Sequence, residues 1–203
     1  MNRPFWSRAF TPVMKVRGKL FVLSGPSGVG KTTLCEYILK NVPGMRYSIS
    51  ATSRPRRKGE KNGREYFFLT KKEFLKWVKQ KRFIEYAEVH GNLYGTPRKF
   101  LTDTIEKGYD VLMDVDVQGG RKLMKEFPNS TFIFVLPPSF NELRKRLAKR
   151  RTEKYQDIIK RLKRAHVELS YKKDYEYTVI NRNLNKTVKG IVTIIKKEIK
   201  KSK

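Results

Sequence analysis

Apolar residues gather in short runs along the chain, and segments with helical spacing separate these runs. The apolar runs predict buried strands at residues 19–24, 47–49, 110–116, 131–136 and 177–180. Apolar residues three and four positions apart predict helices at residues 32–40, 97–107, 118–126, 140–151, 157–171 and 187–200. Strands that alternate with helices are typical of a parallel α/β sheet that helices cover on both faces.

A different pattern interrupts this alternation at about residues 50–95. Residues 50–65 are polar, basic and contain glycine, which predicts an exposed loop. A short strand at 66–70, a helix at 71–80 and a hairpin over 83–95 follow. We therefore expect a small inserted unit with its own antiparallel sheet.

The chain has 203 residues, which predicts one domain whose core comprises residues 19–49 and 97–200. Its one cysteine, Cys35, follows an apolar helical pattern, so we expect a buried thiol and a reducing compartment. No apolar run is long enough to span a bilayer, so we expect no membrane partner. Residues 1–18 form a basic leader without acidic residues, which we expect to be disordered. This leader leaves two locations open, the cytoplasm and an organelle reached by a targeting peptide.

The formal net charge of +28 permits three interpretations. It could attract anionic small molecules, bind nucleic acid, or form a solvated basic surface. Basic residues are spread along the chain and form no stripe interleaved with aromatic residues. This distribution favours anionic ligands over nucleic acid.

A glycine-rich segment, SGPSGVGKTT at residues 24–33, lies between the first predicted strand and the first predicted helix. It fits the pattern G-x-x-x-x-G-K-[ST], whose backbone N–H groups surround phosphate oxygens. Lys31 is expected to reach the β- and γ-phosphates of ATP, and Thr32 to offer its hydroxyl to Mg²⁺. The residues of this predicted ATP site are Gly25, Pro26, Ser27, Gly28, Val29, Gly30, Lys31, Thr32 and Thr33.

Two carboxylates stand at the end of the predicted strand 110–116, in the segment LMDVDVQGG. Alternation along a strand predicts that Asp114 and Asp116 lie on one face. Carboxylates at the end of a buried strand are costly unless a cation or a ligand meets them. Both are candidates for the metal, and we assign Asp114 to Mg²⁺ together with Thr32.

The sequence resembles the guanylate kinases over residues 19–200. The blocks that carry the resemblance are SGPSGVGKTT, SATSRPRRKGEKNGREYFF, FIEYAEVHGNLYGTP, MDVDVQGG, RTEKYQDIIKRL and VINRNL. The resemblance implies transfer of the γ-phosphoryl group of ATP to GMP, with Mg²⁺ as cofactor. It also implies an α/β fold with a P-loop parallel sheet flanked by helices, a GMP-binding insertion at about 50–95 and a helical lid at about 140–160.

The resemblance further implies residue roles. The GMP phosphate would be bound by the guanidinium groups of Arg54 and Arg57 and by the hydroxyls of Tyr66 and Tyr94. Guanine presents an N1–H and an amino group as hydrogen-bond donors. The carboxylates of Glu85 and Asp116 and the hydroxyls of Ser50 and Thr96 would therefore recognise the base. The catalytic cations would be Lys31, Arg54, Arg146, Arg150 and Arg161. Asn181 would contact the adenine of ATP, whereas Glu88, off the motif, is expected to be structural or exposed.

Some features depart from the family pattern. Arg151 stands where the family often has a glycine, and Asn181-Arg182-Asn183-Leu184 replaces the usual N-D-D-L. Two alternatives therefore stay open: a kinase for another nucleoside monophosphate, and a catalytically weak guanylate kinase-like binding module. The segment 50–57 and Glu85 weigh against the first alternative, and the intact phosphate loop with Lys31 and Thr32 weighs against the second. We expect dGMP as a further acceptor, and a monomer or a homodimer.

Overall fold

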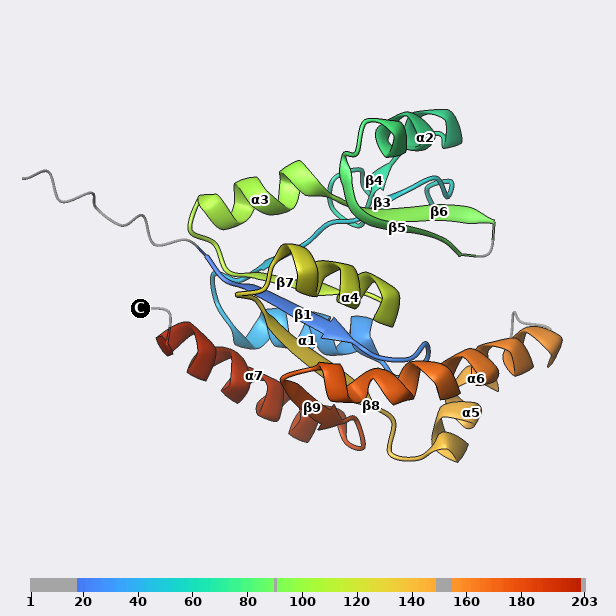
Figure 1. Cartoon of the computed structure of the whole chain (residues 1–203), viewed down its shortest axis with the longest axis vertical. Helices are drawn as coiled ribbons and strands as arrows, with labels where there is room; N and C mark the ends of the chain where they lie inside the picture. Colours follow the sequence, from blue (N-terminus) through green and yellow to red (C-terminus); the bar gives the residue numbers. More distant parts are fainter. Residues whose placement is uncertain (1–17, 90, 149–154, 202–203) are drawn as a thin grey trace, which may run out of the picture.

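The structure, a computed structural model, describes residues 18–89, 91–148 and 155–201 (Figure 1). The predicted leader lies outside these residues except for Gly18, and so do Arg150 and part of the predicted lid. Within the described part of the chain, no helix is long and apolar enough to cross a membrane.

Five parallel strands form the central sheet, in the order β2-β7-β1-β8-β9. Their bounds are β1 Leu20–Ser24, β2 Arg46–Tyr47, β7 Val111–Asp114, β8 Thr131–Leu136 and β9 Tyr177–Ile180. Every residue of β1 is buried, because the strand lies at the centre of a sheet that is covered on both faces. The register pairs Leu23 with Asp114, so the carboxyl ends of β1 and β7 meet at one edge of the sheet.

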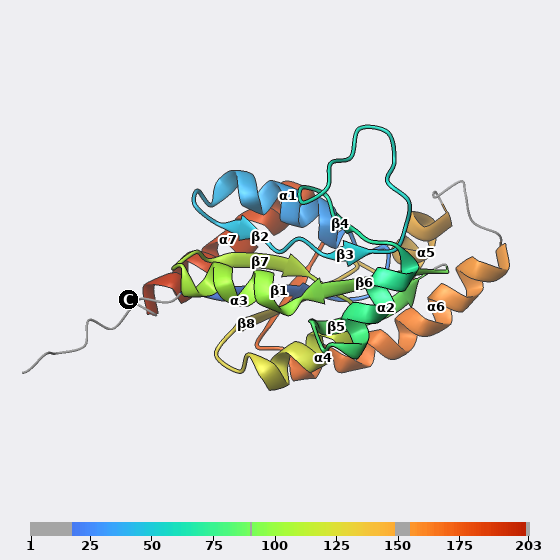
Figure 2. The same cartoon turned by 90° about the horizontal axis from the view of Figure 1, so that it is seen from above.

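Helices cover both faces of this sheet, as the sequence pattern predicts. The helices are α1 Lys31–Asn41, α3 Arg98–Glu106, α4 Val117–Glu126, α5 Phe140–Ala148, α6 Tyr155–Ser170 and α7 Leu184–Lys201. Side chains of α1 and α7 pack on one face, and side chains of α3, α4 and α6 pack on the other. Figure 2 shows α1 and α7 on the opposite side of the sheet from α4 and α6.

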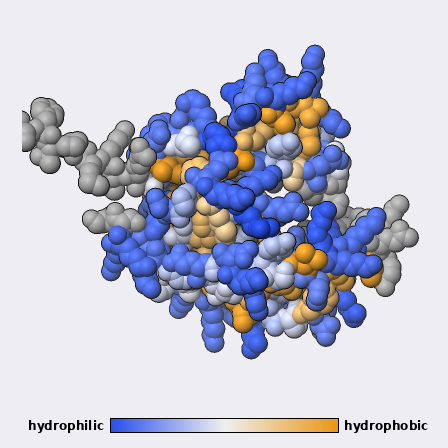
Figure 3. Space-filling view, in the orientation of Figure 1, coloured by the Kyte–Doolittle hydropathy of each residue, from blue (hydrophilic) through white to orange (hydrophobic). Residues whose placement is uncertain are grey.

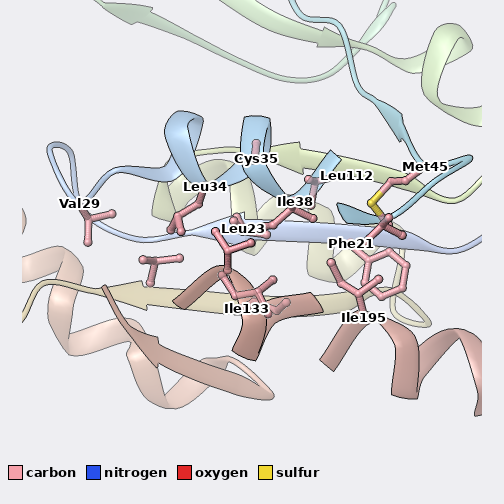
Figure 4. Packing of buried hydrophobic residues seen from close by; sticks show 14 residues of the cluster. Phe21, Leu23, Val29, Leu34, Cys35, Ile38, Met45, Leu112, Ile133 and Ile195 are labelled. Carbon is pink, nitrogen blue, oxygen red and sulfur yellow. The ribbon is translucent and has the colours of Figure 1, made fainter. Parts of the chain in front are cut away.

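The face under α1 and α7 contains the largest group of buried apolar residues. Leu34 and Ile38 of α1 point towards Phe21 and Leu23 of β1, and Ile195 of α7 closes the group (Figure 4). All five side chains are fully buried. Burial of side chains of this size contributes about 1.5–3 kcal/mol each, which holds the phosphate-loop strand and helix in one rigid unit.

The inserted unit forms a second sheet, in the order β4-β3-β6-β5. Its elements are β3 Ala51–Thr52, β4 Phe67–Phe68, α2 Lys71–Lys79, β5 Phe83–Val89 and β6 Asn92–Pro97. The β5–β6 hairpin is antiparallel as predicted. β3, which was not predicted, pairs antiparallel with β6 and parallel with the short β4. Phe74 stacks on Phe83 with ring centroids 4.4 Å apart, and Trp77 and Val78 pack beside them. The predicted helix and hairpin therefore share one small core.

Several boundaries differ from the prediction. The expected exposed loop over 50–65 is wrong at Ala51 and Thr52, which are fully buried in β3. The strand expected at 47–49 is Arg46–Tyr47, which pair with Val111 and Leu112 of β7. Pro97 ends β6 instead of starting the next helix.

Hydrophilic residues cover most of the face shown in Figure 3. Smaller apolar areas lie between them.

Candidate active site

The glycine-rich loop has the backbone that a phosphate-binding loop needs. Gly25, Gly28 and Gly30 all have positive φ angles, of 140°, 86° and 96°. A Cβ at Gly25 would lie 2.3 Å from the carbonyl oxygen of Val135, so no larger residue fits there. Gly30 precedes α1 without a side-chain cap, which leaves the first N–H groups of the helix available to an anion.

Lys31 curls back over this loop. Its Nζ donates to the carbonyl oxygens of Gly25, at 2.6 Å, and Pro26, at 3.2 Å. Burial lowers the pKa of Lys31, and the negative charge of Asp114 acts in the opposite direction. The ammonium group is thus held against the loop.

Asp114, at the end of β7, faces the start of α1. Thr32 Oγ1 donates to Asp114 Oδ2 at 3.2 Å, and the hydroxyl of Tyr47 donates to Asp114 Oδ1. The two residues assigned to the metal are therefore in direct contact. A hydroxyl and a carboxylate are hard oxygen ligands, which suit Mg²⁺.

The prediction that Asp116 lies on the same strand face as Asp114 is wrong. The strand ends at Asp114, and Asp116 is the N-cap of α4, where its Oδ1 accepts from the backbone N–H of Gly119 at 2.7 Å. The prediction of two carboxylates on one strand was wrong because an aspartate before an apolar helical run is also a cap signal.

A pocket of about 390 Å³ lies next to Thr32 and Asp114 and reaches into the inserted unit. Seven predicted site residues line it: Thr32, Ser50, Tyr66, Glu85, Tyr94, Asp114 and Asp116. The structure thus brings residues from α1, the insertion and β7 to one cavity. Tyr47 and Arg64 also line it, and the motif analysis had not selected either.

The carboxylates predicted to read the base come together in this pocket. Thr96 is fully buried and donates to Glu85 Oε1 at 2.7 Å. A Cβ at Gly119 would lie 3.4 Å from Glu85 Oε2 and 3.3 Å from Asp116 Oδ1, so both carboxylates border the same small residue. Burial raises the pKa of Glu85, the hydrogen bond from Thr96 lowers it, and the charge of Asp116 raises it again. Glu88 is exposed, as expected.

The residues predicted to bind the acceptor phosphate lie on the insertion. The rings of Tyr66 and Tyr94 meet edge to face at 5.9 Å, and the Arg54 guanidinium lies 5.5 Å from the Tyr66 ring centroid. Arg54 also donates to Glu60 Oε1 at 2.7 Å. Arg57 is exposed, and its backbone N–H donates to Glu60 Oε2 at 2.7 Å. Neither arginine lines the pocket in this conformation.

The remaining predicted residues that the structure describes lie on α5, on α6 and directly after β9. Asn181 is buried, and its amide donates to the carbonyl oxygen of Val29 at 2.9 Å. Arg146 donates to the carbonyl oxygen of Asn181 and to Glu142 Oε1, both at 3.1 Å. Arg161 is half-buried on α6. Asn181 thus supports the phosphate loop, and Arg146 is tied to the same loop through it.

Comparison with known proteins agrees with this geometry. The sequence model of the guanylate kinase family matches residues 17–198. A guanylate kinase of Thermotoga maritima is 45% identical over 183 residues, which cover 90% of this chain and 88% of the relative. A guanylate kinase of Caldanaerobacter subterraneus is 44% identical over 182 residues, with the same two coverages.

A solved structure shares the fold. The crystal structure of guanylate kinase from Anaplasma phagocytophilum superposes with a TM-score of 0.71 at 37% identity, and it covers 91% of this chain and 87% of that chain. Phosphate loop, carboxylate pocket, family match and shared fold all agree: the chain belongs to the guanylate kinase family.

Proposed function

We propose that this chain transfers the γ-phosphoryl group of ATP to GMP and releases ADP and GDP. One observation carries the proposal. The contact between Thr32 and Asp114 joins the phosphate loop to a pocket that Glu85 of the insertion also lines. A donor site for a nucleoside triphosphate and an acceptor site for a base with two donors therefore share one cavity.

The phosphate loop and Lys31 bind the donor. Backbone N–H groups of residues 25 and 27–33 surround the ATP phosphates, since Pro26 has none, and Lys31 contacts the β- and γ-phosphates. Asn181 holds the shape of the loop beneath them. Thr32 and Asp114 would hold Mg²⁺, which neutralises charge on the ATP phosphates when bound. The described residues contain no group of three or more His, Cys, Asp or Glu side chains that could hold a metal ion.

The insertion binds the acceptor. Arg54, Arg57, Tyr66 and Tyr94 bind the GMP phosphate, and the charge-assisted hydrogen bonds of the guanidinium groups fix its orientation. Without a ligand, the Glu60 carboxylate forms an ion pair with the Arg54 guanidinium. The acceptor phosphate therefore takes the place of that carboxylate. This exchange of one anion for another costs little desolvation of Arg54, whose side chain is already largely buried.

Carboxylates and hydroxyls select the base. Glu85 and Asp116 accept hydrogen bonds from the N1–H and amino group of guanine, while Ser50 and Thr96 add hydroxyl contacts. Adenine presents a lone pair where guanine presents N1–H, so it would leave Glu85 without a donor. No residue in this assignment contacts the ribose of GMP. Because dGMP differs from GMP only in the ribose, we extend the proposal to dGMP.

Transfer then needs alignment and charge neutralisation. An oxygen of the GMP phosphate attacks the γ-phosphorus, and the bond to the bridging oxygen of ADP breaks. Lys31 and Arg54, together with Arg146 and Arg150 of the lid and Arg161 just after it, neutralise the charge that spreads over the transferred group. We propose that the reaction takes place in the cytoplasm, where the buried Cys35 stays reduced.

The base-reading role of Glu85 gives a direct test. Glu85→Gln should raise the KM for GMP by about ten-fold or more and leave the KM for ATP nearly unchanged, because one acceptor for guanine becomes a donor. Glu88→Gln is the matched control on the same strand, since Glu88 is exposed. Equal changes in both KM values for Glu85→Gln would contradict the assignment.

A further inference from the structure

Tyr47 lines the pocket but has no role in the proposed function. It ends β2 and pairs with Leu112 of β7, which places it beside the carboxyl end of that strand. Its ring packs against the core group under α1 and α7, while the residue also lines the pocket. Tyr47 therefore spans from the core to the active site.

The hydroxyl of Tyr47 donates to Asp114 Oδ1, and Thr32 Oγ1 donates to Asp114 Oδ2 at 3.2 Å. Each carboxylate oxygen thus has one hydroxyl donor, from a different element of the fold. Two donors at opposite ends of the group fix the rotation of the carboxylate about its side chain. Each oxygen still keeps a free lone pair, because a carboxylate offers about four acceptor sites.

Thr32 and Tyr47 differ in what they can do when the metal is present. Thr32 is exposed at the start of α1 and is itself assigned to Mg²⁺, so its hydroxyl would turn from Asp114 to the metal. Tyr47 is anchored by its ring and has no such second role. Its phenol has one hydrogen to donate, and that hydrogen bond goes to Asp114 Oδ1.

We propose that Tyr47 is a positioning residue that holds the Asp114 carboxylate in the orientation needed to bind Mg²⁺ with ATP. The inference rests on the proposed function, in which Asp114 and Thr32 form the metal site. Hydrogen-bonding partners of a metal ligand commonly change metal affinity by 10–100-fold when they are removed. The hydroxyl of Tyr47 is such a partner, and its ring secures it in place.

The test compares ATP binding with and without the metal. Affinity is measured by titration calorimetry in excess Mg²⁺ and again in EDTA, for the wild type and for Tyr47→Phe. We expect Tyr47→Phe to weaken Mg²⁺-dependent ATP binding about ten-fold and to leave ATP binding in EDTA unchanged. In steady-state assays, the apparent KM for Mg²⁺ should rise and kcat at saturating Mg²⁺ should recover.

Tyr177→Phe is the matched control. The Tyr177 hydroxyl donates to another carboxylate oxygen, Glu198 Oε1, at 2.9 Å, so this variant loses the same kind of bond away from the pocket. It should leave ATP binding unchanged under both conditions. A double variant with Asp114→Asn provides a second check: once Asp114 no longer binds the metal, Tyr47→Phe should have no further effect on ATP affinity.

The outcomes separate the inference from the function on which it rests. If Mg²⁺ strengthens ATP binding equally in the wild type and in Tyr47→Phe, the inference is wrong. An equal loss of binding with and without Mg²⁺, or a failure of Tyr47→Phe to fold, would assign Tyr47 to the fold alone and also overturn it. If Asp114→Asn retains the full effect of Mg²⁺, the proposed metal site itself fails.

Discussion

Glu198 of α7 forms hydrogen bonds and ion pairs that connect this helix to Lys19, the residue before β1. These contacts allow a quantitative test of the fold. Glu198 is 4% exposed and accepts hydrogen bonds from Lys19 at 3.0 Å, Tyr177 at 2.9 Å and Lys201 at 2.6 Å. These donors, Lys201 first, lower the pKa of Glu198 to about 2, although burial acts in the opposite direction.

The size of the effect follows from this pKa. A carboxyl that is more acidic in the folded than in the unfolded chain stabilises the fold above its unfolded pKa. The shift of the Glu198 pKa from its ordinary value to about 2 corresponds to about 3 kcal/mol of folding stability at neutral pH. Glu198→Gln keeps an acceptor oxygen but loses the charge, so its free energy of unfolding should fall by about this amount.

The pH dependence is specific to this mechanism. The stabilisation is complete above the unfolded pKa and is lost as pH falls towards about 2, because the folded-state carboxylate then becomes protonated. Urea unfolding near pH 7 and near pH 3 should therefore give a difference between wild type and Glu198→Gln that shrinks to under half. Glu106→Gln, at an exposed site on α3, should change little at either pH.

A difference that stays constant between the two pH values would refute this reasoning. It would mean that Glu198 stabilises α7 by packing or by uncharged hydrogen bonds, and that its ionisation contributes nothing. A loss much below 1 kcal/mol near pH 7 would refute the magnitude.

Three further outcomes follow from the site and the core. Lys31→Ala should lower kcat by about a hundred- to a thousand-fold in a coupled assay without lowering the melting temperature; near-normal turnover would contradict its role at the phosphates. Gly120→Ala should destabilise the protein by about 1–3 kcal/mol in urea unfolding, because the new Cβ would lie 2.4 Å from the Tyr175 hydroxyl oxygen; Tyr175→Phe should recover part of this loss, and no recovery would place the strain elsewhere. Excess EDTA should abolish phosphoryl transfer and added Mg²⁺ should restore it, whereas activity in EDTA would exclude the metal role of Thr32 and Asp114.

Local sequence pattern determined much of the fold. The strand predicted at 131–136 and the one at 177–180 match β8 and β9 at both ends. The strand 131–136 is a continuous apolar run, and that signal is local. The phosphate loop was equally accessible, because its glycines, lysine and threonine are adjacent in the chain.

Contacts between distant segments account for what the pattern could not predict. Ala51 and Thr52 form a strand because they pair with Tyr94–Gly95 and Phe67–Phe68, and nothing in their own basic surroundings signals it. The contact of Tyr47 with Asp114 depends on the pairing of β2 with β7, two strands separated by the whole insertion. Asp116 was misplaced for a local reason, since one aspartate can end a strand or cap a helix.

The most direct test of the central claim is a phosphoryl-transfer assay with ATP and Mg²⁺ against GMP, AMP, UMP, CMP and dTMP, each tested separately and with the products resolved by chromatography. The account predicts rapid conversion of GMP to GDP and little conversion of the other four. Conversion of AMP or a pyrimidine nucleotide at a comparable rate would contradict the base-reading roles of Glu85 and Asp116. No conversion of any acceptor would contradict the proposed function.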